Sequence, residues 1–189
     1  MKAKEGNIVN TNRNKLEDVI PLDTPYTLAI DPCNLCNFRC KFCAMQVGEK
    51  QQFQKQFMKL DNFKKIIDDI SSFNKKLKVL RINGQGEPML APDYIEMVKY
   101  ASEKKVADYI ETITNGSQLN PEFNRKLVDS GLNRVRISIE AVDQDGYFDM
   151  TGVRLDFQKF CDNIRDLYEK SRGKLEIYIK IVDAAVEKE

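Results

Sequence analysis

Strand and helix patterns alternate along this chain, and that alternation limits the possible folds more than any other feature of the sequence. Short segments rich in β-branched and apolar residues predict strands, and between them apolar residues recur at helical spacing. This order is typical of parallel strands joined by right-handed helical crossovers. The expected strands are residues 24–31, 77–83, 107–114, 134–141 and 175–182.

Four helices are expected between these strands. Asp61 is expected to cap the first helix, whose apolar face extends to Phe73, and Pro92 is expected to begin the second. The third opens at Asn120-Pro121 and ends at Gly131, and the fourth carries apolar residues over 157–167.

The length of the chain restricts the architecture further. The chain has 189 residues, whereas a closed eight-stranded barrel needs roughly 250. We therefore predict an α/β fold with parallel strands, a partial TIM-like (β/α) barrel truncated at about five strands. Residues 1–23 are polar and are expected to form an amino-terminal arm, and residues 24–189 a single core domain that is incomplete at its carboxyl end.

The fourth and fifth predicted strands alternate between apolar and polar residues, whereas buried parallel strands are normally apolar throughout. Helices must cover the apolar faces. The polar faces then line either a cavity for a polar ligand or an edge of the sheet that faces solvent, and the pattern leaves both open. These polar residues are Arg134, Arg136, Ser138 and Glu140 on the fourth strand and Glu176, Tyr178 and Lys180 on the fifth.

The sequence contains no histidine, which excludes Ser-His-Asp and Cys-His catalysis and every His-ligated metal site. Lys and Arg number 30 against 29 Asp and Glu, a net charge of +1 without long blocks of either sign. We therefore expect no binding to nucleic acid or to an anionic membrane. No signal peptide is recognisable and no segment approaches the ~18 apolar residues of a membrane span, so a reducing cytoplasm is the expected location.

Four of the five cysteines, Cys33, Cys36, Cys40 and Cys43, lie close together in one predicted loop. Disulfide frameworks spread their cysteines along a short chain, so this cluster indicates a metal site, and thiolates without His select zinc or an iron-sulfur cluster. Zinc knuckles normally stand a dozen or more residues apart, unlike these pairs. Cys33 is expected to be a small loop residue, although an alternative set of ligands that includes Cys33 and Cys36 stays open. Cys161 is expected to be a small residue of the core.

The spacing Cys36-x3-Cys40-x2-Cys43, on a loop directly after the first predicted strand, resembles the cysteine motif of the radical S-adenosylmethionine (radical SAM) superfamily. The resemblance implies that these three thiolates hold a 4Fe-4S cluster. The remaining iron would bind the amino and carboxylate groups of S-adenosylmethionine, and Phe42 would pack beside the adenine.

Further motifs of the resemblance follow the next strands in order. The segment Gly84-Gln85-Gly86-Glu87-Pro88 resembles the Gly-Gly-Glu-Pro motif that receives the methionine amino group, with Gln85 as a departure. Asn115 lies in a Thr-Asn-Gly turn, and Ser138 and Glu140 stand where the family bonds the ribose hydroxyls. The resemblance thus implies cofactor contacts from Phe42, Gly84, Gly86, Glu87, Asn115, Ser138 and Glu140.

The fifth predicted strand adds two weaker analogies. Apolar residues near Ile179 and Ile181 would border the adenine, and Lys180 or Arg136 would meet a carboxylate. The polar faces favour a polar substrate, either peptide or sugar-like.

The implied reaction is reductive cleavage of S-adenosylmethionine to a 5'-deoxyadenosyl radical that abstracts hydrogen from the substrate, with electrons from a flavodoxin- or ferredoxin-like donor. The chain also resembles members with a cysteine-rich (SPASM/twitch-like) carboxyl-terminal extension. We expect that extension and the sixth strand to be absent, as in a fragment or an unusually short member. Two alternatives are an iron-sulfur electron-transfer protein that leaves S-adenosylmethionine intact and a structural zinc module.

Overall fold

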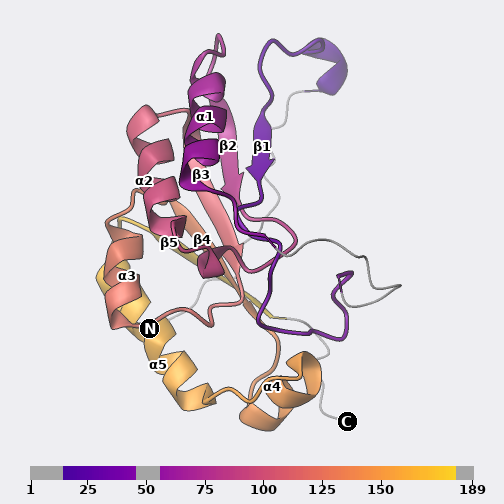
Figure 1. The fold of residues 1–189 in the computed structure, drawn as a ribbon, viewed down its shortest axis with the longest axis vertical. Helices are drawn as coiled ribbons and strands as arrows, with labels where there is room; N and C mark the ends of the chain where they lie inside the picture. Colours follow the sequence, from indigo (N-terminus) through magenta and orange to yellow (C-terminus); the bar gives the residue numbers. More distant parts are fainter. Residues whose placement is uncertain (1–14, 46–55, 182–189) are drawn as a thin grey trace.

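The computed structural model describes residues 15–45 and 56–181 of the chain. All five predicted strands are found there, in one sheet whose strand order follows the sequence (Figure 1). Every neighbouring pair is parallel. The predicted α/β fold with a parallel sheet is therefore confirmed. The strands are β1 (Thr27–Ile30), β2 (Leu77–Ile82), β3 (Ala107–Thr114), β4 (Arg134–Ile139) and β5 (Glu176–Ile181).

The described residues contain five α-helices, one more than the sequence patterns predict. The additional helix, α4, lies between β4 and α5, and only Tyr147 and Thr151 are buried in it, so it lacks the apolar face on which the prediction relied. The helices are α1 (Leu60–Ser71), α2 (Tyr94–Lys104), α3 (Pro121–Val128), α4 (Gln144–Thr151) and α5 (Phe157–Ser171), with 3-10 turns at Leu16–Asp18 (η1) and Pro88–Leu90 (η2).

Some predicted helix ends are shifted. Lys59 occupies the N-cap position of α1, so the predicted cap Asp61 lies in the first turn, where its charge still suits the helix dipole. Phe73 lies beyond the end of α1 and is 38% exposed, outside the predicted buried face. The second helix begins at Tyr94, after Pro92.

The predicted start of the third helix is confirmed, because the Asn120 side chain accepts hydrogen bonds from the backbone N–H groups of Glu122 and Phe123. Gly131 lies beyond the last helical residue, Val128, and has a φ of +84°. Only glycine adopts that left-handed conformation without strain, so Gly131 turns the chain towards β4.

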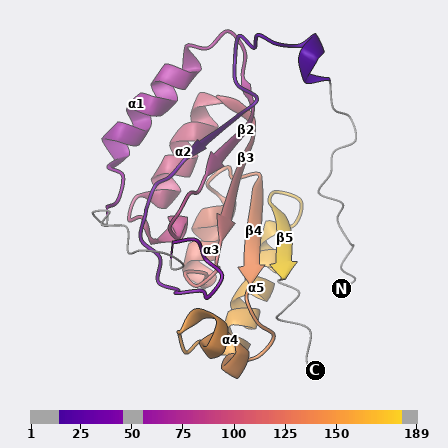
Figure 2. The same cartoon turned by 90° about the vertical axis from the view of Figure 1, so that its right-hand side faces the viewer.

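The sheet has one apolar face and one polar face. In β4 the buried residues Val135, Ile137 and Ile139 alternate with half-buried Arg136 and Ser138. Helices α1, α2, α3 and α5 lie on one side of the sheet in Figure 1, and Figure 2 looks onto the opposite side. Because β4 is paired with both β3 and β5, its polar residues lie on a face of the sheet and not at an edge.

The register agrees with the alternation expected for the fifth strand. Ile179 pairs with Ile137, and Ile181 pairs with Ile139. Residues paired in a parallel sheet point to the same face, so both isoleucines lie on the apolar side and not beside Ser138. The expectation that apolar residues near Ile179 and Ile181 border the adenine stays a prediction. Their side chains are about half-exposed there.

The predicted boundary between an arm and a core at residue 24 stays a prediction. Residues 15–23 carry the single turn η1, and the following residue, Thr24, is buried. Among the described residues, no helix combines the length and the apolar character that a membrane crossing requires.

Candidate active site

The cysteine loop begins where β1 ends, at the carboxyl edge of the sheet. All strands are parallel, so the segments that follow β2, β3 and β4 lie at the same edge. In α/β sheets this is the edge at which ligands bind. All five cysteines are free thiols.

Two N–H groups approach the sulfur of Cys36, which is an exposed residue. The backbone N–H of Phe38 donates to Sγ at 3.4 Å, and Nδ2 of Asn115 donates at 3.8 Å. Burial of the sulfur raises the pKa of the Cys36 thiol, and the N–H of Phe38 opposes that rise. The structure thus brings Asn115, from the end of β3, into contact with the cysteine loop.

Cys40 is held between two residues that bind the end of α4. The backbone N–H of Arg39 donates to the carbonyl of Thr151 at 2.9 Å, and that of Lys41 to the carbonyl of Met150 at 3.0 Å. Both carbonyls belong to the last turn of a helix, where carbonyl groups lack partners within the helix. The end of α4 therefore positions the loop on both sides of Cys40.

The three thiols Cys36, Cys40 and Cys43 lie near enough to influence one another. The pKa of Cys40 is raised to about 12, mainly by burial. The charge of Glu140 adds to this rise, and the other two sulfurs have smaller effects. The backbone N–H of Cys43 donates to the carbonyl of Cys40 at 3.0 Å, which closes a turn around Phe42. The Phe42 ring is half-exposed. Metal binding at these sulfurs must release protons.

Cys33 is a buried part of the loop. Its backbone N–H donates to Oδ1 of Asp31 at 3.2 Å, and its Sγ donates to the carbonyl of Leu35 and accepts from the N–H of Leu35. This engaged sulfur supports the interpretation of Cys33 as a loop residue over the register that pairs it with Cys36. Cys161 is half-buried on α5.

The glycines after β2 lie against the cysteine loop. A Cβ at Gly86 would stand 2.2 Å from the carbonyl oxygen of Cys33 and 2.4 Å from that of Leu35. A Cβ at Gly84 would stand 2.0 Å from Cγ of Asp31. Contacts within the protein therefore already require glycine at both positions.

Glu87 is buried, and donors of the protein engage both of its carboxylate oxygens. Oε1 accepts from Oγ1 of Thr114 at 2.6 Å and from the N–H of Met89 at 3.1 Å, and Oε2 accepts from the N–H of Asn115 at 2.7 Å. Its own N–H donates to the carbonyl of Leu35 at 2.7 Å. Glu87 therefore ties the cysteine loop to the ends of β2 and β3, and burial raises its pKa.

Ser138 and Glu140 follow one another along the polar face at the end of β4. Ser138 pairs in register with Lys180. Glu140 is 5% exposed, and its Oε2 has no hydrogen-bond partner within residues 15–45 and 56–181. Burial raises the pKa of Glu140, and the charge of Lys180 partly offsets the rise. A buried carboxylate oxygen is costly without a donor, so this atom suits a hydroxyl or amine of a ligand.

Tyr147 connects Glu140 to the cysteine loop, a role that the sequence analysis missed. Its hydroxyl accepts a hydrogen bond from the backbone N–H of Glu140 at 3.3 Å. Its ring makes an edge contact with Phe38, at 6.3 Å between centroids, and also packs on Phe160 of α5. No periodic pattern marks this tyrosine, because its partners are distant in sequence.

The polar face also contains an ion cluster around one buried carboxylate, which the sequence analysis missed. Glu111, which is 1% exposed, accepts from Nε of Arg81 at 2.6 Å and pairs with Arg136 at 3.1 Å and Arg134 at 3.4 Å. Burial favours a higher pKa for Glu111, but the hydrogen bond from Arg81 and the arginine charges outweigh it and lower the pKa. Arg136, expected to meet a ligand carboxylate, thus meets a carboxylate of the protein.

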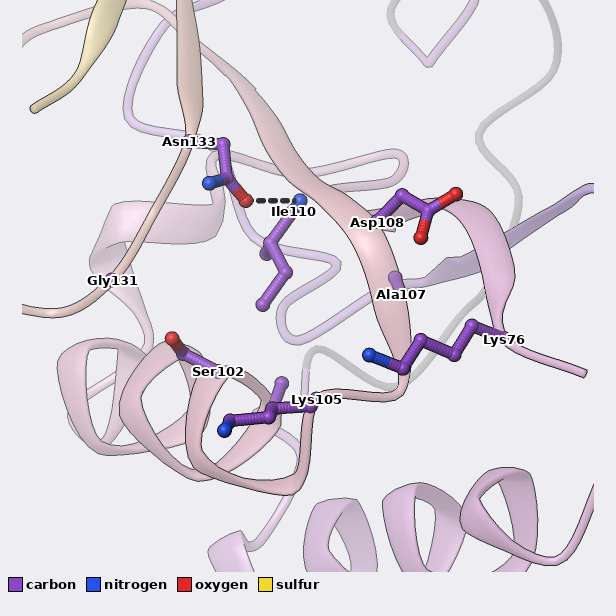
Figure 3. Close-up of a pocket in the computed structure, with 9 residues that line it drawn as sticks. Lys76, Ser102, Lys105, Ala107, Asp108, Ile110, Gly131 and Asn133 are labelled. Atoms are coloured by element: carbon purple, nitrogen blue, oxygen red, sulfur yellow. Dashed lines mark hydrogen bonds between the residues drawn. The ribbon is translucent and has the colours of Figure 1, made fainter.

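A cavity of about 280 Å³ lies at the opposite edge of the sheet, between the end of α2 and the start of β3 (Figure 3). Lys76, Ser102, Lys105 and Asn133 contribute polar groups to its lining. None of the predicted site residues lines it.

A parallel α/β sheet with a thiol-bearing loop and polar groups at its carboxyl edge defines the core of a cofactor-binding enzyme. The family model of the Radical SAM superfamily matches residues 30–182, most of the chain. The chain belongs to the radical SAM superfamily. Members of this superfamily use a 4Fe-4S cluster and S-adenosylmethionine, which are the cofactors of this chain.

Two curated proteins are similar in sequence to part of this chain. A GTP 3',8-cyclase of Desulforamulus reducens is 31% identical over 124 residues, which are 66% of this chain and 37% of that protein. A tungsten-containing aldehyde ferredoxin oxidoreductase cofactor-modifying protein of Pyrococcus furiosus is 31% identical over 115 residues, 61% of this chain and 31% of that protein.

Solved structures share the fold. Streptococcus suis SuiB bound to S-adenosylmethionine matches 90% of this chain and 38% of its own, with a TM-score of 0.65 and 20% identity. Native anSMEcpe with bound AdoMet matches 82% of this chain and 44% of its own, with a TM-score of 0.63 and 19% identity. The chain thus spans less than half the length of these relatives.

The donor set of the loop fits an iron-sulfur cluster. In the described ranges no three Cys, Asp or Glu side chains are arranged to hold a single metal ion. A 4Fe-4S cluster takes one thiolate on each ligated iron, so its ligand sulfurs do not converge on one point. Three thiols on one loop supply thiolates for such a cluster, and the buried carboxylate oxygen of Glu140 near Cys40 suits a polar co-ligand.

Proposed function

We propose that this chain is the cofactor-binding core, residues 24–189, of a radical SAM enzyme that abstracts hydrogen from a polar substrate, either peptide or sugar-like. Cys36, Cys40 and Cys43 are the cluster ligands. The observation that carries the proposal is their position on one loop at the carboxyl edge, next to Asn115 of β3 and Glu140 of β4. Membership of the superfamily supports it.

The residues around the loop take distinct parts in binding S-adenosylmethionine. Oε2 of Glu140, buried and without a partner among the described residues, accepts from a ribose hydroxyl, and Ser138 assists on the same face. Phe42 covers the adenine with its half-exposed ring. Gly84, Gly86 and Glu87 fix the backbone that receives the methionine amino group, because they hold the loop after β2 against the cysteine loop.

Cys36, Cys40 and Cys43 would hold the cluster. With one electron from a flavodoxin- or ferredoxin-like donor, it would supply reductive cleavage of the sulfonium C5'–S bond to methionine and a 5'-deoxyadenosyl radical, which would become 5'-deoxyadenosine by taking a substrate hydrogen atom. The chain itself orients the sulfonium and shields it from water. Lys180 and Tyr178 remain on the polar face to bind substrate, which favours a polar molecule. The three thiols can bind a cluster only while they are not oxidised to disulfides. A reducing compartment keeps them in that state, which supports the cytoplasm as the location.

Anaerobic reconstitution with iron and sulfide tests the proposal. We expect about four irons per chain, as a 4Fe-4S cluster requires, and formation of 5'-deoxyadenosine from S-adenosylmethionine under a strong reductant. A reducible cluster that leaves S-adenosylmethionine intact would instead indicate an electron-transfer protein. One tightly bound zinc without iron absorbance would indicate a structural module.

The ligand assignment is tested by Cys40→Ser with Cys161→Ser as its matched control. We expect Cys40→Ser to lose iron and 5'-deoxyadenosine formation, and Cys161→Ser to retain both, because Cys161 belongs to α5 and not to the cysteine loop. A Cys40→Ser protein with a full cluster and normal cleavage would show that Cys40 is not a ligand.

A further inference from the structure

The side chain of Asn115 is held in one orientation by its neighbours. Its Oδ1 accepts a hydrogen bond from the backbone N–H of Ser117 at 3.0 Å, which identifies the other terminal atom as the nitrogen. Nδ2 donates to Oδ1 of Asn37 at 3.0 Å and to Sγ of Cys36 at 3.8 Å. An amide nitrogen has two hydrogens, so both are used.

The backbone of Asn115 is fixed as well. Its N–H donates to the buried carboxylate of Glu87 at 2.7 Å, and the residue is 8% exposed. Asn37, its partner on the cysteine loop, is itself anchored by donating from Nδ2 to Oγ of Ser117 at 2.8 Å. The end of β3 thus presents a preorganised N–H donor to one specific sulfur of the loop.

The surroundings of the sulfurs are unequal. The charge of a carboxylate acts on both sulfurs, Glu87 on Cys36 and Glu140 on Cys40. Cys36 also has donors from Asn115 and from the backbone of Phe38, which oppose that charge. An N–H group directed at a ligating thiolate stabilises negative charge on it. A reduced cluster carries one more negative charge than an oxidised one, so such a donor favours reduction and raises the potential.

We propose that Asn115 is a positioning residue that raises the reduction potential of the cluster through its hydrogen bond to the Cys36 sulfur. The inference rests on the proposed function, since it takes Cys36 as a cluster ligand. It assigns Asn115 an action on the thiolate in addition to the contact with S-adenosylmethionine that the resemblance implies.

The chain offers substitutions that isolate this hydrogen bond. Asn115→Asp keeps the oxygen that accepts from Ser117 and replaces the donor nitrogen by an anionic oxygen. Asn115→Ala removes the donor without adding charge. Asn37→Asp is the control for added charge, because it still offers an acceptor to Asn115 and gives up only the hydrogen bond from Nδ2 to Ser117.

The experiment is a potentiometric titration of the reconstituted cluster, followed by electron paramagnetic resonance of the reduced state, in the full chain without S-adenosylmethionine. We expect the midpoint potential to fall in the order wild type, Asn115→Ala, Asn115→Asp, with Asn37→Asp closer to wild type than Asn115→Asp is. Iron content and absorbance confirm that each variant holds a full cluster.

Two results with full clusters would overturn the inference alone: an Asn115→Ala potential equal to that of wild type, or equal shifts in Asn115→Asp and Asn37→Asp. A wild-type chain that takes up no cluster would overturn the proposed function together with this inference. Loss of the cluster in Asn115→Ala, with uptake retained in Asn37→Asp, would also contradict it, because the residue would then be required for assembly and not for tuning.

Discussion

The carboxylate of Glu87 accepts the backbone N–H of Asn115 at 2.7 Å, so the loop after β2 is bound directly to the end of β3. The same carboxylate accepts from Thr114 and Met89, and it is buried. A single side chain therefore organises two of the segments that surround the cysteine loop.

Glu87→Gln should destabilise the fold, because one oxygen that accepts a hydrogen bond becomes a nitrogen that faces another donor. We expect a loss of about 1–3 kcal/mol in the free energy of unfolding, the cost of an unsatisfied buried group. Urea unfolding of the metal-free protein measures it. The control Glu96→Gln affects a carboxylate that pairs with Lys99 at the surface, and its effect should stay within ~0.5 kcal/mol. Equal effects of the two substitutions would contradict the structural role of Glu87.

Gly86→Ala should displace the cysteine loop. The new Cβ would stand 2.2 Å from the carbonyl oxygen of Cys33 and 2.7 Å from the backbone nitrogen of Leu35, and backbone atoms cannot rotate away. We expect a loss of about 1–3 kcal/mol in stability, as for other overpacked sites, together with reduced iron uptake on reconstitution. Thermal unfolding and iron analysis check both effects, and a variant with wild-type stability and iron content would refute the close packing at Gly86.

Glu111→Gln should change how stability depends on pH. The arginines lower the pKa of Glu111 in the folded protein below its ordinary value of 4.5. The folded state therefore favours the ionised form, so this contribution is present above pH 4.5 and is lost as the pH falls through the lowered pKa. Glu111→Gln has no carboxyl group to protonate at this position. Its stability should therefore fall less than that of wild type as the pH drops below 4.5.

At neutral pH the same variant removes the carboxylate of Arg81 and Arg136, while Arg134 keeps Glu176. We expect it to lose about 1.5–3 kcal/mol, as for other hydrogen bonds between charged groups. Urea unfolding at pH 7 and at several values below 5 measures both effects. The control Glu122→Gln removes an exposed partner of Lys126 on α3. If acid destabilised Glu111→Gln as much as wild type, Glu111 would not be a source of the pH dependence of stability.

Gly152→Ala should loosen the cysteine loop from α4. Gly152 ends α4 with a φ of +69°, next to the Thr151 carbonyl that accepts from Arg39. We expect faster amide hydrogen exchange at Arg39 and Lys41 in the metal-free protein. Gly173→Ala is the matched control, since Gly173 has a φ of +80° and no atom within 4 Å of the added Cβ.

Both substitutions strain the backbone by about 1–2 kcal/mol, but only Gly152 adjoins the loop. The two variants should therefore lose similar stability and differ in exchange at Arg39 and Lys41. Unchanged exchange of these amides in Gly152→Ala would show that the end of α4 does not hold the loop.

The sequence by itself determined the alternation of strands and helices, the thiol loop after β1, and the polar residues at the strand ends. These features depend on local periodicity and on short spacings such as that between Cys36 and Cys43, which are written in consecutive residues. Asn120 was recognised as a cap for the same reason, because its partners lie two and three residues away.

Only the tertiary structure decided which distant residues meet. The pairing of Ser138 with Lys180 follows from the register between β4 and β5, and the ion cluster of Glu111 needs three strands in alignment. The contact between Asn115 and Cys36 joins residues 79 positions apart. Pairings of this kind depend on how the whole chain packs, because no local pattern in a sequence encodes the register of one strand against another.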